Sequence, residues 1–250
     1  MVMDFPKEFC KEIATDKPDW LVKGILSSND LLYGFGTDTK ILSRVFELLS
    51  FPFIKKVADT NKYIIEVSSE QTVYPDFTLY KSKESKEKIA IDIKSTYRRY
   101  SKNGKSKPFN FTLGSYTSFL RNNTKNILYP YDEYATHWVI GFVYDRENIG
   151  SKSLDIVALD DRDKVKSPFK NVEFFVQEKY KISGEDPGSG NTANIGSIYG
   201  TLSDFENGNS PFAKLGEKVF RDYWANYGRF KPRPYNNLKG YSEWKKSQKK

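Results

Sequence analysis

The segment Ile89-Ala90-Ile91-Asp92-Ile93-Lys94 alternates strictly between isoleucine and other residues. Side chains of a β-strand point alternately to opposite faces, so the three isoleucines share one face, and Asp92 and Lys94 share the other. A carboxylate within such a buried-looking strand costs free energy unless it is paired or binds a metal. Asp92 therefore indicates a functional site inside a sheet.

A second strand precedes this one. Residues 76–80 and 88–94 flank the charged segment 81–87, which predicts an antiparallel β-hairpin with a loose turn. Directly opposite residues of such a pair share a face, so a register that places Asp76 across from Asp92 brings the two carboxylates together. A register shifted by one residue would separate them.

These side chains match the requirements of phosphodiester hydrolysis. Pro75-Asp76 followed by Asp92-Ile93-Lys94 supplies two carboxylates for Mg²⁺, which prefers few protein carboxylates and keeps several waters. Lys94 lies about 7 Å along the strand from Asp92 and can reach a phosphate. Neighbouring carboxylates favour its charged form, so we expect an electrostatic and orienting role rather than that of a simple general base. The alternative interpretation is a set of surface charges around a turn.

The rest of the chain predicts helices interleaved with strands. Residues 38–50 show the apolar spacing of a helix, with Asp38 or Thr37 as N-cap and an end at Pro52. Further helices are predicted for residues 113–128 and 215–227, and strands for residues 137–144 and 172–177. This order indicates an α/β fold with a mixed central β-sheet flanked by helices. We find no repeat or long linker, so residues 1–250 are expected to form a single domain with two lobes.

Basic residues outnumber acidic ones, 40 to 32, which gives a net charge of +8. Two stretches concentrate this excess. Residues 229–250 hold eight Lys or Arg and one Glu, and residues 98–107 hold five Lys or Arg and no acid. The second stretch closely follows Lys94, so phosphate contact near the chemistry is one interpretation and a solvated loop is the other.

Composition also argues against several classes of protein. The most apolar run, residues 137–144, is far short of the roughly 20 residues that span a bilayer, so no membrane partner is expected. Residues 1–10 have no apolar core of a secretory signal, and Cys10 is the only cysteine, which fits a reducing cytoplasm. One cysteine and one histidine are too few for a zinc site or a Ser-His-Asp triad, so His137 is interpreted as structural.

A polar segment that contains glycine, Gly-Ser-Gly-Asn-Thr-Ala-Asn, occupies residues 188–194. It is not a P-loop, because no Gly-Lys-Ser/Thr follows. Small residues allow close backbone approach to a base pair, and an Asn amide can pair with adenine in the major groove. The segment is therefore either a loop that reads DNA or an ordinary flexible turn.

Beyond these motifs, the chain resembles the EcoRV-like type II restriction endonucleases of the PD-(D/E)xK superfamily. The resemblance rests on five stretches: GTDTKILSRVFELLS from Gly36, YPDFTLYK from Tyr74, KIAIDIKSTY from Lys88, FTLGSYTSFLRNNTKNILYP from Phe111 and GSGNTANIGSI from Gly188. It implies a restriction-endonuclease-like fold with a DNA-binding and catalytic lobe and a smaller dimerisation lobe. It also implies a homodimer that cuts double-stranded DNA with Mg²⁺ at the centre of GATATC, giving blunt ends with 5′-phosphates, alongside a cognate DNA methyltransferase.

The resemblance implies roles for individual residues. Asp76, Asp92 and Glu47 correspond to metal ligands, and these three act in catalysis together with Lys94. DNA contacts are implied for Gly188, Ser189, Gly190, Asn191, Thr192 and Asn194 in the polar segment, for Gln71 and Lys125, and for Thr39, Lys40, Ser43, Ser95 and Thr96. The likeness is poor over the first 35 residues, and Glu70 and Thr72 replace amide side chains next to Gln71.

Two other functions are compatible with the same residues. A repair or nicking nuclease of this superfamily would share Asp76, Asp92 and Lys94 but would cut one strand. A DNA-binding module with an inactive site would not cut DNA at all.

Overall fold

The computed structural model describes residues 3–34, 36–68, 70, 72–147, 155–188 and 193–248. The helices in these ranges are α1 (Phe5–Asp16), α2 (Thr39–Thr60), α3 (Lys179–Ile182), α4 (Leu202–Glu206), α5 (Glu217–Asn226) and α6 (Leu238–Ser247), with 3-10 helices η1 (Tyr131–Glu133) and η2 (Leu159–Lys164). The strands are β1 (Gly24–Leu26), β2 (Leu31–Gly34), β3 (Ile64–Val67), β4 (Phe77–Tyr80), β5 (Lys88–Tyr97), β6 (Thr112–Ser115), β7 (Tyr134–Arg146), β8 (Ile156–Ala158), β9 (Phe169–Glu178), β10 (Ser183–Pro187) and β11 (Asn194–Ser197). Across these described ranges, we find no helix with the length and hydropathy of a membrane span.

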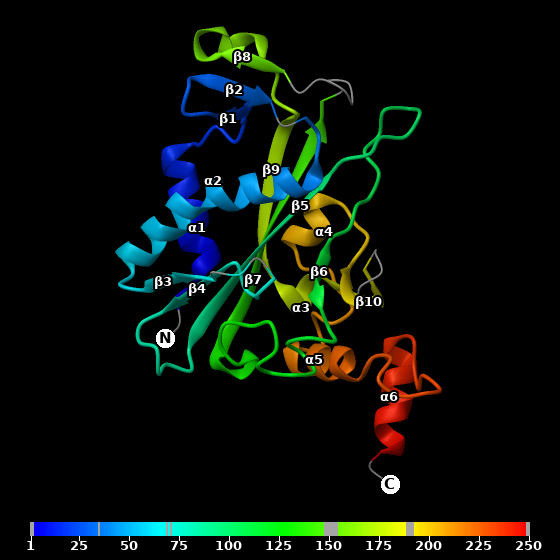
Figure 1. Ribbon diagram of the computed structural model, residues 1–250. Helices are drawn as coiled ribbons and strands as arrows, with labels where there is room; N and C mark the ends of the chain where they lie inside the picture. Colours follow the sequence, from blue (N-terminus) through cyan, green and yellow to red (C-terminus); the bar gives the residue numbers. More distant parts are fainter. Residues whose placement is uncertain are drawn as a thin grey trace.

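A five-stranded sheet forms the centre of the molecule, with strand order β3-β4-β5-β7-β9. β5 and β7 run parallel, whereas the other neighbouring pairs are antiparallel. Helices lie on both sides of this sheet (Figure 1). The predicted α/β fold with a mixed central sheet is therefore confirmed. The predicted hairpin is present as β4 and β5, and the predicted strands at residues 137–144 and 172–177 lie within β7 and β9.

One face of the central sheet packs against α1 and α2. The isoleucines of β5, including Ile91, join a buried cluster with Phe9 of α1, Phe46 of α2 and Phe142 of β7. The ring of Phe46 stacks on that of Phe142, with centroids 4.6 Å apart. This face therefore takes up the apolar side of β5, as its alternation predicts, and leaves Asp92 and Lys94 on the opposite side.

On the opposite face, Val139 and Val143 of β7 join a second buried cluster that also contains Phe205 of α4, Trp224 of α5 and Tyr241 of α6. Gly141 of β7 lies across from Phe175 of β9, and a Cβ at position 141 would collide with the Phe175 ring. Glycine here lets the ring approach the β7 backbone. β7 therefore contributes side chains to both clusters, whereas the isoleucines of β5 belong to the first.

One predicted helix boundary is wrong. Asp38 caps the N-terminus of α2 as predicted, but the helix continues through Pro52 to Thr60. Proline removes one backbone hydrogen bond and crowds the preceding turn. The buried side chains of Ile54 and Val57 belong to the same core cluster as Phe46. This packing keeps the second half of the helix in place despite the local cost of Pro52.

The helix predicted for residues 113–128 is absent. These residues instead form part of β6 and a series of turns. Gly114 and Asn126 adopt positive φ angles of 94° and 53°, which an α-helix does not allow. The Ser118 hydroxyl donates to the Lys125 carbonyl at 2.8 Å and so closes a compact loop. Local polar contacts of this kind compete with helix formation. In contrast, the helix predicted for residues 215–227 is present as α5.

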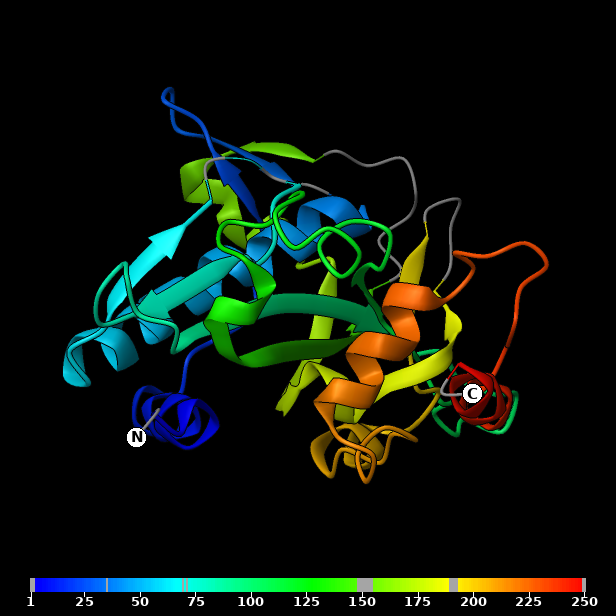
Figure 2. The ribbon, with the colours of Figure 1, turned by 90° about the horizontal axis from the view of Figure 1, so that it is seen from below.

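Two smaller sheets flank the centre. One has the strand order β10-β11-β6 and the other β1-β2-β8. In the first, β6 pairs with β11, and β11 pairs with β10, the strand that ends at Pro187. The second lies above α2 in the view of Figure 1. Figure 2 shows that α5 and the C-terminal helix α6 lie on the side of the molecule away from α1.

Candidate active site

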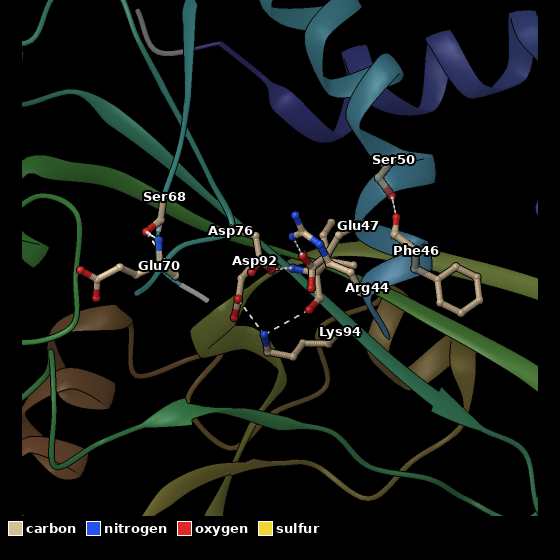
Figure 3. Close-up of polar contacts among 10 residues, drawn as sticks. Arg44, Phe46, Glu47, Ser50, Ser68, Glu70, Asp76, Asp92 and Lys94 are labelled. Atoms are coloured by element: carbon tan, nitrogen blue, oxygen red, sulfur yellow. Dashed lines mark hydrogen bonds and ion pairs between the residues drawn. The ribbon is translucent and has the colours of Figure 1, made fainter. Parts of the chain in front are cut away.

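Asp76 and Asp92 meet at the end of the β4–β5 hairpin that lies away from its turn (Figure 3). The register pairs Phe77 with Ile91, and its continuation by one residue places Asp76 opposite Asp92. Asp76 Oδ2 accepts a hydrogen bond from the Ile93 backbone N–H at 2.6 Å, which holds this carboxylate against β5. The register that a shared metal site requires is therefore present.

Lys94 lies on the same face of β5 as Asp92 and contacts it directly. Its Nζ donates to Asp92 Oδ1 at 2.6 Å and to the Ile93 carbonyl at 3.1 Å. Burial acts against the ammonium, but the charges of Asp92, Asp76 and Glu47 outweigh it and raise the pKa of Lys94 above its usual value. Lys94 is thus a charged group at neutral pH, in agreement with the expected electrostatic role.

The pKa values of the two aspartates shift in opposite directions. Burial raises the pKa of Asp76 to about 7; Lys94 opposes this shift, and the charges of Asp92 and Glu47 add to it. Burial acts on Asp92 in the same sense, yet Lys94 and Lys179 lower the pKa of Asp92 below its usual value. Asp92 is therefore ionised at neutral pH, whereas Asp76 has a carboxyl that a nearby cation would help to ionise.

The sequence analysis missed one charged residue of this cluster, Lys179, the first residue of α3. Its Nζ lies 3.4 Å from Asp92 Oδ2 and 3.7 Å from the centroid of the Tyr74 ring, and the residue is 1% exposed. In the part of the chain that the structure describes, neither Lys179 Nζ nor Asp92 Oδ2 makes a hydrogen bond. Burial lowers the pKa of Lys179 to about 8, although Asp92 opposes the shift. The contact joins residues far apart in the chain, so no local pattern marked it.

Aromatic rings enclose the buried side of this cluster. Tyr74 stacks on Phe119 with centroids 4.5 Å apart, and its hydroxyl forms a 2.8 Å hydrogen bond with His137 Nδ1. His137 in turn stacks on Tyr131 at 3.9 Å. Burial and the nearby charge of Lys179 hold the pKa of His137 well below its usual range, so the ring is neutral. These contacts support the interpretation of His137 as a structural residue.

Glu47 reaches this region from α2 and forms an ion pair with Arg44 (Figure 3). Arg44, Glu47, Glu70 and Asp76 line an open cavity of about 260 Å³. Within the described residues, no three His, Cys, Asp or Glu side chains are grouped closely enough to hold a metal ion together. The structure therefore brings Glu47 near Asp76 without joining it to the aspartate pair as a third ligand.

A second cavity, of about 180 Å³, opens over Asp76, Asp92 and Lys94 and is also lined by Ser115 of β6. Asn194 pairs with Ser115 across β11 and β6, and the Gly188 N–H donates to the Asn194 carbonyl at 2.8 Å. The segment 188–194 therefore begins and ends beside the cavity that holds the catalytic candidates. Ser189, Gly190, Asn191 and Thr192, and also Gln71, lie outside the described residues, so their contacts stay predictions.

A third cavity, of about 360 Å³, continues from Lys94 along β5. Four predicted DNA-contacting residues line it together: Thr39 and Ser43 from α2, and Ser95 and Thr96 from β5. Lys40 and Lys125 are exposed and are not part of these three linings. Asp76 lines the first two cavities and Lys94 the last two, so the three cavities adjoin one another across the site.

The comparison with protein families decides the class of enzyme. The family model described as restriction endonuclease EcoRV matches residues 16–246, which is most of the chain. The chain belongs to this restriction endonuclease family. As a member of the EcoRV family, it is a type II restriction endonuclease, a site-specific deoxyribonuclease that acts on double-stranded DNA. Neither the repair nuclease nor the inactive DNA-binding module receives support from the comparisons.

A relative of high sequence identity agrees with this assignment. The chain is 46% identical over 226 residues to the type II restriction enzyme EcoRV of Escherichia coli, and the match covers 89% of this chain and 90% of that protein. Among solved structures, the NlaIV restriction endonuclease matches with a TM-score of 0.40 and 10% sequence identity, over 90% of this chain and 87% of that one. The membership in the EcoRV family rests on the first match and on the family model.

Proposed function

We propose that this member of the EcoRV family is a Mg²⁺-dependent homodimer that recognises GATATC. It cuts both strands at the centre and leaves blunt ends with 5′-phosphates. The observation that carries the proposal is the meeting of Asp76, Asp92 and Lys94 in one cavity, beside the two ends of segment 188–194. The residues that cut the DNA and the residues that recognise its sequence would then act on the same stretch of DNA.

The aspartate pair fits Mg²⁺. Burial is the main cause of the raised pKa of Asp76, and the charges of Asp92 and Glu47 add to it, which favours a divalent cation between the two aspartates. Mg²⁺ is usually bound by one or two carboxylates and keeps several waters, so two aspartates suffice. When bound, the metal neutralises charge on the scissile phosphate and activates a water. Glu47 is proposed as a further acidic group on the side of Asp76 that faces α2.

The chain's own residues supply the remaining chemistry. Asp76 and Asp92 hold the metal, and the Ile93 N–H fixes the position of Asp76. Lys94 stays protonated at neutral pH, so its ammonium stabilises negative charge on the phosphate and orients the attacking water. The recognition roles proposed from family membership are base reading by Gly188, Ser189, Gly190, Asn191, Thr192 and Asn194, an approach to the minor groove by Gln71, and backbone contacts by Thr39, Lys40, Ser43, Ser95, Thr96 and Lys125.

We propose that two subunits associate through the β1-β2-β8 sheet, the smaller lobe of a single domain of residues 1–250. Ile25, Tyr33 and Ile156 lie directly opposite one another on these three strands, so they share one face. They are 59%, 40% and 55% exposed, which leaves an apolar row open to a second copy. GATATC reads the same on both strands, so it suits a dimer with two-fold symmetry.

The proposed partner enzyme and cellular compartment follow from this chemistry. An enzyme that cuts GATATC endangers the DNA of its own cell, so a DNA methyltransferase of the same specificity belongs to the proposal. Cytoplasmic localisation is also part of it, and the exposed free thiol of Cys10 fits such a reducing compartment.

One digestion tests the main proposal. Purified protein with Mg²⁺ is incubated with plasmid DNA, and the ends of the fragments are sequenced. We expect blunt ends only within GATATC, and we expect Asp92→Ala to bind the same DNA without cutting it. Cleavage at another sequence would refute the proposed site, and nicks in one strand would refute the proposed double-strand cut.

A further inference from the structure

A basic hairpin, defined here as residues 98–107, extends β5 beyond the active site. Tyr100 bridges to Ser106, the Lys107 N–H donates to the Arg99 carbonyl at 2.7 Å, and the Ser101 N–H donates to the Lys105 carbonyl at 2.9 Å. Figure 1 shows this hairpin projecting from the end of β5, away from the body of the molecule. It is therefore an ordered arm.

The base of the basic hairpin is fixed to the central sheet. The Tyr100 hydroxyl donates to Asp145 Oδ1 at 2.7 Å, and the Arg98 guanidinium pairs with Asp145 and Glu173. Asp145 and Glu173 belong to β7 and β9, so neighbouring strands hold the arm at its root. The charge of Arg98 is used for this attachment and is not available to a partner.

The outer part of the basic hairpin carries charges without such partners. Lys102, Lys105 and Lys107 are exposed. None of the acidic side chains in the described ranges forms an ion pair with them. Exposed lysines on a hydrogen-bonded hairpin create a positive potential that attracts a polyanion.

The basic hairpin is continuous with the active-site surface. Arg99 lines the 360 Å³ cavity together with Lys94 and Thr96, and it also lines the adjoining cavity with Asn110 and Tyr199. A strand advances about 3.3 Å per residue, so Lys102 can lie up to roughly 26 Å from Lys94. In a six-base-pair site, only three base pairs, or about 10 Å, separate the central cut from each end. The arm is long enough to pass the end of the recognition sequence.

We infer that Lys102, Lys105 and Lys107 bind phosphates of the DNA that flanks the recognition site. The inference rests on the proposed function in that duplex DNA must lie across Lys94. The arm adds affinity that does not depend on sequence, because phosphate contacts position a protein on DNA without reading bases. The partner is thus duplex DNA outside the six recognised base pairs.

The test compares a triple variant, Lys102→Gln, Lys105→Gln and Lys107→Gln, with the wild-type dimer. The matched control changes three exposed lysines of and next to α1, Lys7→Gln, Lys11→Gln and Lys17→Gln, which removes the same charge from a distant part of the molecule. Binding is measured without added metal over a range of salt, on short and long duplexes of roughly 10 and 24 base pairs that contain GATATC. Thermal unfolding checks that each variant is folded.

We expect the hairpin variant to bind the long duplex more weakly than the wild type and to bind the short duplex almost equally. For each lysine that contacts a phosphate, the slope of log K against log salt should become shallower by about 0.9 on the long duplex. The control variant should keep the wild-type slope. Equal slopes for the hairpin variant and the wild type would overturn the inference, as would an equal loss on both duplexes.

A second measurement does not depend on substitution. A reagent that acylates exposed lysines should label Lys102, Lys105 and Lys107 less when the long duplex is bound than when the short duplex is bound. Equal labelling in both complexes would contradict flanking contact. If the wild type binds and cuts DNA at a sequence other than GATATC, the proposed specificity fails while the comparison of duplex lengths still decides the role of the arm.

Discussion

Lys179 Nζ lies 3.4 Å from Asp92 Oδ2, and both side chains are almost fully buried. The positive charges of Lys94 and Lys179 flank the carboxylate and outweigh the effect of its burial, so the pKa of Asp92 falls below its usual value. The sequence motif supplies Lys94, but only the tertiary structure supplies Lys179. An ionised Asp92 therefore depends on a residue outside the motif.

We expect Lys179→Met to move the pH dependence of single-turnover cleavage toward higher pH. Without the ammonium, Asp92 loses one of the two charges that lower its pKa, so a higher pH is needed to ionise it. Rates would be compared between roughly pH 6 and 9. Lys181→Met is the control, because Lys181 lies on the same short helix as Lys179 but pairs with Glu178 at the end of β9 instead of Asp92. An unchanged profile for Lys179→Met would show that Lys179 does not control Asp92.

Asp76→Asn should stabilise the metal-free protein near pH 8 and should have little effect near pH 4. The folded-state pKa of Asp76, about 7, lies above the ordinary value of 3.8, so the fold binds more protons than the unfolded chain between these values. Stability from this group is present below pH 3.8 and is lost as the pH rises through 7. The gain at high pH should be on the order of a few kcal/mol. Urea unfolding with a chelator measures it.

In the same unfolding experiment, Asp92→Asn should change the free energy of unfolding in the opposite direction. The folded-state pKa of Asp92 is lowered, so its contribution is present above the ordinary pKa of 3.8 and is lost as the pH falls through the lower folded value. The neutral substitution should therefore destabilise the protein at neutral pH. If both variants changed the free energy of unfolding in the same direction, the opposite assignments for the two aspartates would be wrong.

Lys94→Met should reduce the single-turnover cleavage rate by roughly 100- to 1,000-fold and leave DNA affinity nearly unchanged. The expected loss is in the chemical step, because the ammonium contacts Asp92 and the cavity over the aspartate pair. Lys86→Met, in the exposed turn of the same hairpin, serves as the control and should cut normally. A variant that lost binding and cutting in parallel would argue for a role in DNA affinity alone.

Tyr33→Asp should convert the proposed homodimer into monomers. The substitution places a charge in the middle of the exposed row that Ile25 and Ile156 complete, where a second copy is expected to pack. Sedimentation analysis measures the oligomeric state, and a plasmid assay separates nicks from double-strand cuts. Ile64→Asp, on the exposed part of β3, is the matched control. A dimer that survives Tyr33→Asp would place the interface elsewhere.

The hairpin was predictable because its pattern is local and strict. A strand with the alternation of residues 89–94 can bury either of its two faces, and the isoleucines determine which face is buried. The same pattern left the register of the hairpin open, and the structure has the register that places Asp76 opposite Asp92. The mixed sheet followed from the order of strands and helices. The hairpin depends on residues close together in the chain, and the sheet class depends on the order of the elements.

The features that sequence analysis missed depend on contacts across the chain or on local polar competition. Pro52 suggested a helix end, but burial of Ile54 and Val57 outweighed it. Residues 113–128 looked helical by apolar spacing, whereas Gly114 and the bond from Ser118 to the Lys125 carbonyl fold them into turns. Lys179 reaches Asp92 only because β9 ends beside β7, which no spacing rule reveals.

The parallel pairing of β5 with β7 also has a consequence for chains that are only partly synthesised. A chain that ends before Tyr134 already contains Asp76, Asp92 and Lys94, yet β5 has no neighbour on one side and Lys179 has not been made. Pairings between strands far apart in sequence also form slowly. A truncated or partly synthesised chain therefore carries the proposed catalytic side chains without the complete sheet that holds them, and we expect such fragments not to cut the DNA of the cell that makes them.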